Sequence, residues 1–198
     1  MAQAKKLATS KTVKSSTVTF GVCAACDPRI DAASRQRTVN IIETIAELIS
    51  GEVRLPDGTP VGVVWSPVLI DGERQADIVA RQFKDSGVGA IVCTPDTWAF
   101  PQLTLMSLLA HFPAELPVNI TCGNSAPKPG VVYAHAVNGA LAQSGRLTHL
   151  NVGTWPDTGA KPQPTESTVK ALIDWCYAAM TVVGLRGRRD AEQPDDPH

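Results

Sequence analysis

The chain has 198 residues, with 19 acidic and 18 basic side chains and a formal net charge of -1. One domain is expected at this length, and the balanced charge gives no reason to expect nucleic acid or an anionic membrane as a partner. No uninterrupted apolar run approaches the roughly 18 residues of a membrane span. The five cysteines are an odd number, which favours free thiols in a reducing compartment. We therefore expect a soluble, cytoplasmic protein.

The chain opens on a basic, polar leader, residues 1–16, which we expect to be flexible because it lacks the hydrophobic stretch of a secretory signal. Five short apolar runs rich in β-branched residues follow. Their continuity is typical of strands that are covered on both faces. The expected strands are residues 18–23, 61–65, 88–93, 118–122 and 147–152.

Segments with helical periodicity alternate with these strands. They cover residues 34–50, 73–86, 103–112, 131–145 and 165–185. Because parallel strands need crossover connections, the alternation predicts a three-layer α/β domain with a five-stranded parallel sheet in the flavodoxin-like or Rossmann-like order 2-1-3-4-5. We assign residues 17–189 to this single domain. Residues 190–198 are interpreted as a disordered tail, because the charged stretch from Arg186 contains prolines and lacks apolar periodicity.

Long loops follow the expected strands and hold many polar and tryptophan residues. In a parallel α/β sheet, ligands bind outside the carboxyl ends of the strands. Trp98 and Trp155 lie in these loops and Trp65 ends a strand, so they either cover the strand ends or serve a ligand. Planar hydrogen-bonding groups beside an indole ring suit a polyhydroxylated ligand. The polar residues expected at this edge are Asp27, Arg29, Asp31, Arg35, Thr94, Asp96, Gln102 and Asn124.

Cys23 and Cys26, within the stretch GVCAACDPRID at residues 21–31, have the C-x-x-C spacing of a thiol redox centre. In such a centre, a helix N-terminus lowers the pKa of the first thiol. Here the helical pattern starts only after Asp31, and Asp27 would raise a thiol pKa. Redox chemistry is therefore the less favoured interpretation, and zinc is less favoured still, because it would need about two further Cys or His ligands.

Other catalytic motifs are missing from the sequence. It contains no G-x-G-x-x-G after the first expected strand, no G-x-x-x-x-G-K-[ST] and no G-x-S-x-G. Glu43 and Glu47 lie one helical turn apart, as metal ligands can, but near Arg35 and Arg37 on the polar face of their helix. A solvated face is the better interpretation, so we predict no catalytic and no metal-binding residue in this chain.

Four stretches resemble the N-terminal domain of the L-fucose isomerase family, in the family's order and spacing. They are FGVCAACDPRIDAASR, CTPDTWAFPQLT, PKPGVVYAHAVNGALAQSG and WCYAAMTVVGLRGRR, and the resemblance covers about residues 17–189. The family's P-x-I-D-x-x-R and T-P-…-W elements are both represented. The matching residues are Pro28, Ile30, Asp31 and Arg35 in the first element, with one residue inserted, and Thr94, Pro95 and Trp98 in the second.

The resemblance implies substrate-binding residues Trp98, Arg29, Asp31 and Asp27. In the family, the tryptophan packs against the sugar in a neighbouring subunit's active site. An arginine just before the proline of the first element also approaches the sugar. Here Asp27 holds that place and Arg29 follows the proline, which puts the arginine's role in question.

The resemblance also implies an incomplete enzyme. Family members convert an aldose to its ketose with Mn²⁺, which is held by residues of the second and third domains, and this chain stops where the second would begin. Our first hypothesis is a substrate-covering and oligomerisation domain that binds no cofactor, is inactive alone, and works as a homo-oligomer or with companion domains on a small sugar. The alternative is a stand-alone sugar-binding or regulatory module. A third hypothesis is a thiol oxidoreductase using Cys23 and Cys26.

Overall fold

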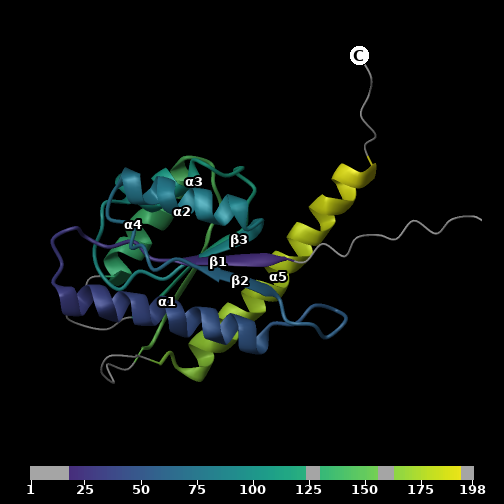
Figure 1. The fold of residues 1–198 in the computed structure, drawn as a ribbon, viewed down its shortest axis with the longest axis horizontal. Helices are drawn as coiled ribbons and strands as arrows, with labels where there is room; N and C mark the ends of the chain where they lie inside the picture. The colour runs from purple at the N-terminus through teal and green to yellow at the C-terminus, as the bar shows by residue number, and fades with distance from the viewer. Residues whose placement is uncertain (1–17, 124–129, 156–162, 193–198) are drawn as a thin grey trace, which may run out of the picture.

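Five parallel strands form one sheet in the order β2-β1-β3-β4-β5, as Figure 1 shows. The computed structural model describes residues 18–123, 130–155 and 163–192, and the side chains of these residues as far as 186. The expected leader, Asn124 and residues 193–198 lie outside the described residues. The predicted fold class and strand order are confirmed. The strands are β1 (Thr19–Cys23), β2 (Gly62–Trp65), β3 (Val88–Cys93), β4 (Val118–Gly123) and β5 (His149–Gly153).

Helices cover both faces of this sheet and make three layers (Figure 1). One face packs against α1 (Ala32–Glu52) and α5 (Glu166–Glu192). The other face packs against α2 (Glu73–Asp85), α3 (Leu105–Leu109) and α4 (Gly130–Gln143). Along β1 and β3, alternate side chains enter opposite cores, which is why these strands are apolar. At the sheet edge, β5 leaves His149 and Val152 exposed.

The third expected helix is shorter than its sequence pattern predicts. Residues 103–112 are apolar nearly all round, but a 3-10 turn, Pro101–Leu103, precedes an α-helix of only five residues, α3. Thr104 separates the two because its backbone leaves the helical region, with φ -121° and ψ -99°. The Arg146 guanidinium then donates to the carbonyls of Leu109 and Phe112 at 3.0 and 2.8 Å, which satisfies acceptors where the helix ends.

The last helix is longer than expected, because it continues beyond Leu185 to Glu192. No proline interrupts it before Pro194, and arginine, alanine and glutamate are good helix formers. Its end runs past the sheet in Figure 1, where it is yellow. Among the described helices, its stretch Glu166–Arg186 is long and apolar enough to cross a membrane by length and composition alone. Leu172 and Cys176 on its inner side are nevertheless buried in the core.

Candidate functional site

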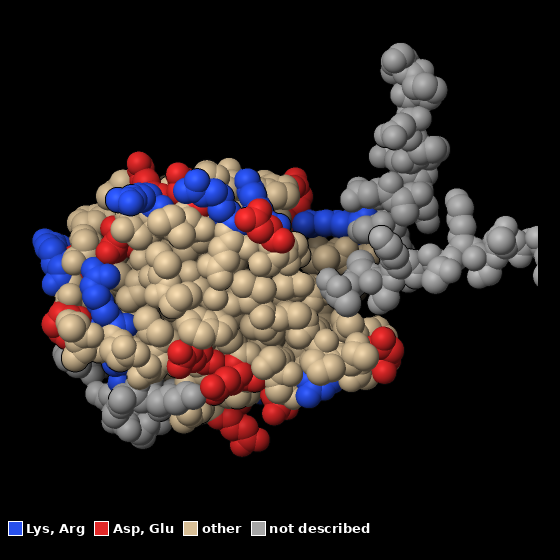
Figure 2. Space-filling model, in the orientation of Figure 1, with Lys and Arg blue, Asp and Glu red and all other residues tan. Residues whose placement is uncertain are grey.

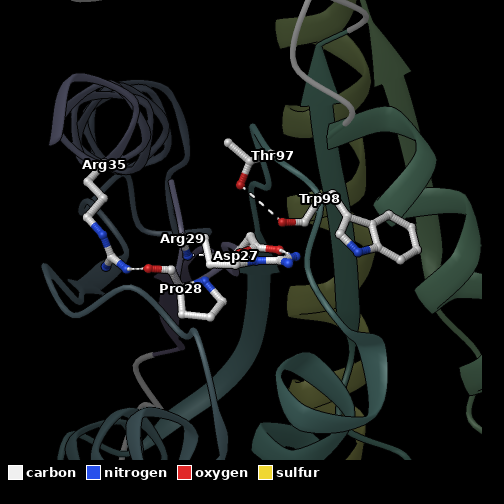
Figure 3. A network of polar contacts seen from close by, with 6 residues as sticks. All are labelled: Asp27, Pro28, Arg29, Arg35, Thr97 and Trp98. Atoms are coloured by element: carbon white, nitrogen blue, oxygen red, sulfur yellow. Dashed lines mark hydrogen bonds and ion pairs between the residues drawn. The ribbon is translucent and has the colours of Figure 1, made fainter. Parts of the chain in front are cut away.

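Three loops meet at the carboxyl end of the sheet and form what we call the rim, defined as residues 24–31, 66–72 and 94–104. Cys23 and Cys93 are register partners at the ends of β1 and β3, and the Thr94 amide donates to the Cys23 carbonyl at 2.8 Å. The Ile70 amide donates to Ala24, which ties the loop after β2 to the loop after β1 at 3.0 Å. Arg29 and Trp98 therefore lie at the same edge of the sheet, as Figure 3 shows.

Asp27 and Arg29 form a close ion pair within the first loop. Both oxygens of the Asp27 carboxylate accept from the Arg29 guanidinium, from Nε at 2.8 Å and from Nη2 at 2.6 Å. The backbone N–H of Arg29 donates to the same carboxylate at 2.8 Å. These hydrogen bonds from Arg29 lower the pKa of Asp27 to about 2. The pair is thus ionised throughout the physiological range.

Asp31 has a structural task that sequence reasoning did not assign to it. One carboxylate oxygen accepts from the Ser34 amide and the other from the Ser34 hydroxyl, both at 2.8 Å. This makes Asp31 the N-cap of α1, which satisfies amides that the first helical turn leaves free. Its binding to a sugar, like that of the other three candidate residues, stays a prediction.

Two further ion pairs connect the rim loops to α1. In each pair, only one of the two residues was predicted from the sequence as a site residue. Arg35 donates to Asp71 in the second loop and to the Pro28 carbonyl in the first, both at 3.0 Å. Arg37 donates through Nε to Asp96 in the third loop at 3.0 Å. Asp71 and Arg37 lie 36 and 59 residues from their partners, so no local sequence signal could have found them.

Trp98 is half-buried and held by other aromatic rings. Its ring meets Tyr133 of α4 edge-on, with centroids 6.4 Å apart and an angle of 89° between the planes. Phe100 approaches it in the same manner at 6.3 Å. The Tyr133 hydroxyl is in turn hydrogen-bonded to Thr104 at 2.9 Å. The indole is therefore fixed in place with part of its surface left open at the rim.

The tryptophans at this end of the sheet do not form one cluster. Trp155 is buried and packs over β4, where a Cβ on Gly123 would come within 2.4 Å of its ring. Trp65 and Trp155 belong to the core under α1 and α5, whereas Trp98 packs against the core on the opposite face. Trp155 thus covers a strand end, whereas Trp98 keeps part of its surface open at the rim, as the neighbouring Phe100 does.

The cysteines of the C-x-x-C stretch are buried. A hydrogen bond with Cys93 and burial hold the pKa of Cys23 well above its usual range. Burial raises the pKa of Cys26 to about 11. Redox thiols need the opposite, a lowered pKa and access to solvent. The structure thus offers no support for the thiol oxidoreductase hypothesis.

The donor set of the described residues does not fit a metal ion. Within 18–123, 130–155 and 163–186, no three His, Cys, Asp or Glu side chains gather closely enough to hold one. His111 pairs with Asp77 at 2.8 Å, and His149 is hydrogen-bonded to Asn119 at 2.9 Å. These histidines have structural partners, as their isolated positions in the sequence indicate.

Comparison with known proteins identifies the family. The family model for the first N-terminal domain of L-fucose isomerase matches residues 17–187. The chain is 29% identical to the L-fucose isomerase of Phocaeicola vulgatus over 77% of this chain and 25% of the relative. It is 32% identical to that of Streptococcus pneumoniae serotype 4 over 76% of this chain and 25% of the relative. It spans about a quarter of the length of these curated relatives. The chain belongs to the L-fucose isomerase family, as a counterpart of that family's first N-terminal domain.

Proposed function

We propose that this chain binds and covers a small sugar at its rim, as the first domain of an aldose–ketose isomerase assembly. The observation that carries the proposal is the shared position of Trp98 and Arg29 at the carboxyl edge of the sheet, in a chain of this family. Trp98 offers an apolar ring surface to the C–H face of a sugar. Arg29 offers N–H donors to its hydroxyls.

The reacting centre lies outside the described residues in this proposal. Moving a proton between adjacent carbons needs a base and an electrophile, which a metal ion such as Mn²⁺ supplies when it is bound. The described residues do not fit a metal, so the metal site belongs to the other domains of the assembly. The work of the described residues is to bind the sugar, orient it and exclude water, and the chain alone is inactive.

The partners follow from the same reasoning. The relatives are about four times longer than the stretch they share with this chain, so the remaining parts of the assembly come from companion domains, further copies or both. We place the assembly in the cytoplasm, because all five cysteines are free thiols.

The test is an aldose–ketose assay with L-fucose and Mn²⁺. It uses the full chain alone and the chain mixed with a polypeptide that carries the remaining domains of a relative. We expect turnover only in the mixture and a reduced turnover with Trp98→Ala. Ile78→Ala is the matched control, because this side chain is also 38% exposed but lies on α2, outside the rim. Turnover by the chain alone would contradict the proposal, whereas L-fucose binding by an isolated monomer that no companion domain activates would favour the stand-alone binding module.

A further inference from the structure

Arg29 is held firmly although its side chain projects into solvent. The Arg29 side chain is 77% exposed, while the Asp27 side chain paired with it is 10% exposed. An exposed arginine normally samples many rotamers, and ordering it costs entropy. Here the paired hydrogen bonds to Nε and Nη2 select one orientation, and the bond from the Arg29 backbone fixes the carboxylate itself. Asp27 therefore determines where the guanidinium points (Figure 3).

The hydrogen bonds to Asp27 leave part of the Arg29 guanidinium available to a ligand. A guanidinium has five N–H donors, and Asp27 takes one on Nε and one on Nη2. The remaining three, two on Nη1 and one on Nη2, have no partner among the described residues. They form a donor surface in a fixed position at the rim, at the same edge of the sheet as Trp98.

The rim supplies these donors without a net positive charge. Each of the three arginines that contact the rim loops is paired with a carboxylate. Arg29 pairs with Asp27, Arg35 with Asp71, and Arg37 with Asp96. On the left of Figure 2, where the strands end, basic and acidic side chains accordingly lie next to one another. Hydroxyl groups need only donors and acceptors, whereas uncompensated positive charge strengthens the binding of a phosphate.

We propose that Asp27 is a positioning and specificity-determining residue that aims the Arg29 guanidinium and cancels its charge. Arg29 then donates to neutral sugar hydroxyls and does not favour a phosphate group. The inference rests on the proposed function, because it takes a sugar as the ligand of the rim. It also explains why Asp27 stands before Pro28, where the family has an arginine: Asp27 and Arg29 form one hydrogen-bonded pair across this proline.

The first experiment measures how firmly Arg29 is held, and it needs no sugar. In the full chain, the exchange of the Arg29 Nε proton with water is followed by NMR in the wild type and in Asp27→Ala. We expect exchange about two- to fivefold faster in the variant, as the loss of a solvent-exposed ion pair predicts. Equal exchange rates would overturn the positioning role.

The second experiment measures specificity with two probes, L-fucose and inorganic phosphate, titrated against the same NMR signals. Asp27→Asn keeps one acceptor oxygen for Arg29 but removes the negative charge and the second acceptor, so phosphate should bind about fivefold more tightly and L-fucose more weakly. Arg29→Lys should lose the L-fucose response, because a lysine has no fork of donors. Asp57→Asn is the matched control, since Asp57 also accepts from the backbone and side chain of the residue two positions later, Thr59, but in the return loop between α1 and β2.

The outcomes separate the two proposals. Unchanged phosphate affinity in Asp27→Asn, or the same increase in Asp57→Asn, would overturn the charge-cancelling role of Asp27. If the exchange and phosphate results appear as expected but L-fucose moves no Arg29 signal in the wild type, the sugar-binding function fails. The holding of Arg29 by Asp27 then stands on its own.

Discussion

The ion pair between Arg37 and Asp96 should be the most important electrostatic brace of the rim. It joins α1 to the loop that carries Trp98, with Nε and Oδ2 3.0 Å apart. The Arg37 side chain is 14% exposed and that of Asp96 is 5% exposed. Arg37→Met keeps most of the aliphatic volume but leaves the Asp96 carboxylate unpaired where water hardly reaches it.

The size of the effect follows from this burial. Breaking a buried pair from one side costs about 3–5 kcal/mol, and the partial exposure of Arg37 places it at about 3 kcal/mol. Because 1 kcal/mol shifts the melting temperature of a domain this size by about 2–4 °C, we expect a decrease of about 6–12 °C. Arg35→Met is the matched control, because its pair with Asp71 is 35% and 17% exposed and should contribute less than about 1 kcal/mol.

Thermal and urea unfolding of Arg37→Met, Arg35→Met, Asp96→Asn and the double variant Arg37→Met with Asp96→Asn would measure these free energies. The double variant should recover part of the loss, because it removes the unpaired buried charge. Additive effects of the two changes, or equal losses in Arg37→Met and Arg35→Met, would refute the reasoning.

Three further predictions concern other parts of the molecule. Gly123→Ala should lower the free energy of unfolding by about 1–3 kcal/mol, because its Cβ would meet the Trp155 ring at 2.4 Å, whereas Gly139→Ala, in open space on α4, should be neutral or stabilising in the same urea titration. The stabilising pair of Asp27 with Arg29 should be fully present above the usual carboxyl pKa of 3.8 and be lost as the pH falls through about 2. Carboxyl NMR should show the Asp27 pKa rising toward 3.8 in Arg29→Ala, and an unchanged value would contradict the assignment. All five cysteines are buried, so a thiol reagent at pH 8 should label them only after unfolding, and rapid labelling of the native chain would contradict the burial.

Local sequence patterns predicted the layers of this fold. The five apolar runs predicted five strands, and the helical segments between them required parallel crossovers. Full cover on both faces was expected of all five, but the edge strands β2 and β5 are only partly buried. The apolar periodicity did not predict where a helix is interrupted or where it ends. Thr104 interrupts an apolar run that looks like one continuous helix, and α5 continues to Glu192 through a charged stretch that lacks apolar periodicity. Neither apolar periodicity nor its absence reports on these backbone conformations.

The same distinction applies to the rim. Chain order and parallel pairing placed the loops of Arg29 and Trp98 at one edge, because every parallel strand ends on the same side of its sheet. The amino-acid sequence could not show that Asp31 caps α1, that Asp96 pairs with Arg37, or that Trp155 is buried over Gly123. Such partners are chosen by distances between segments that are remote along the chain, and those distances exist only once the layers have packed.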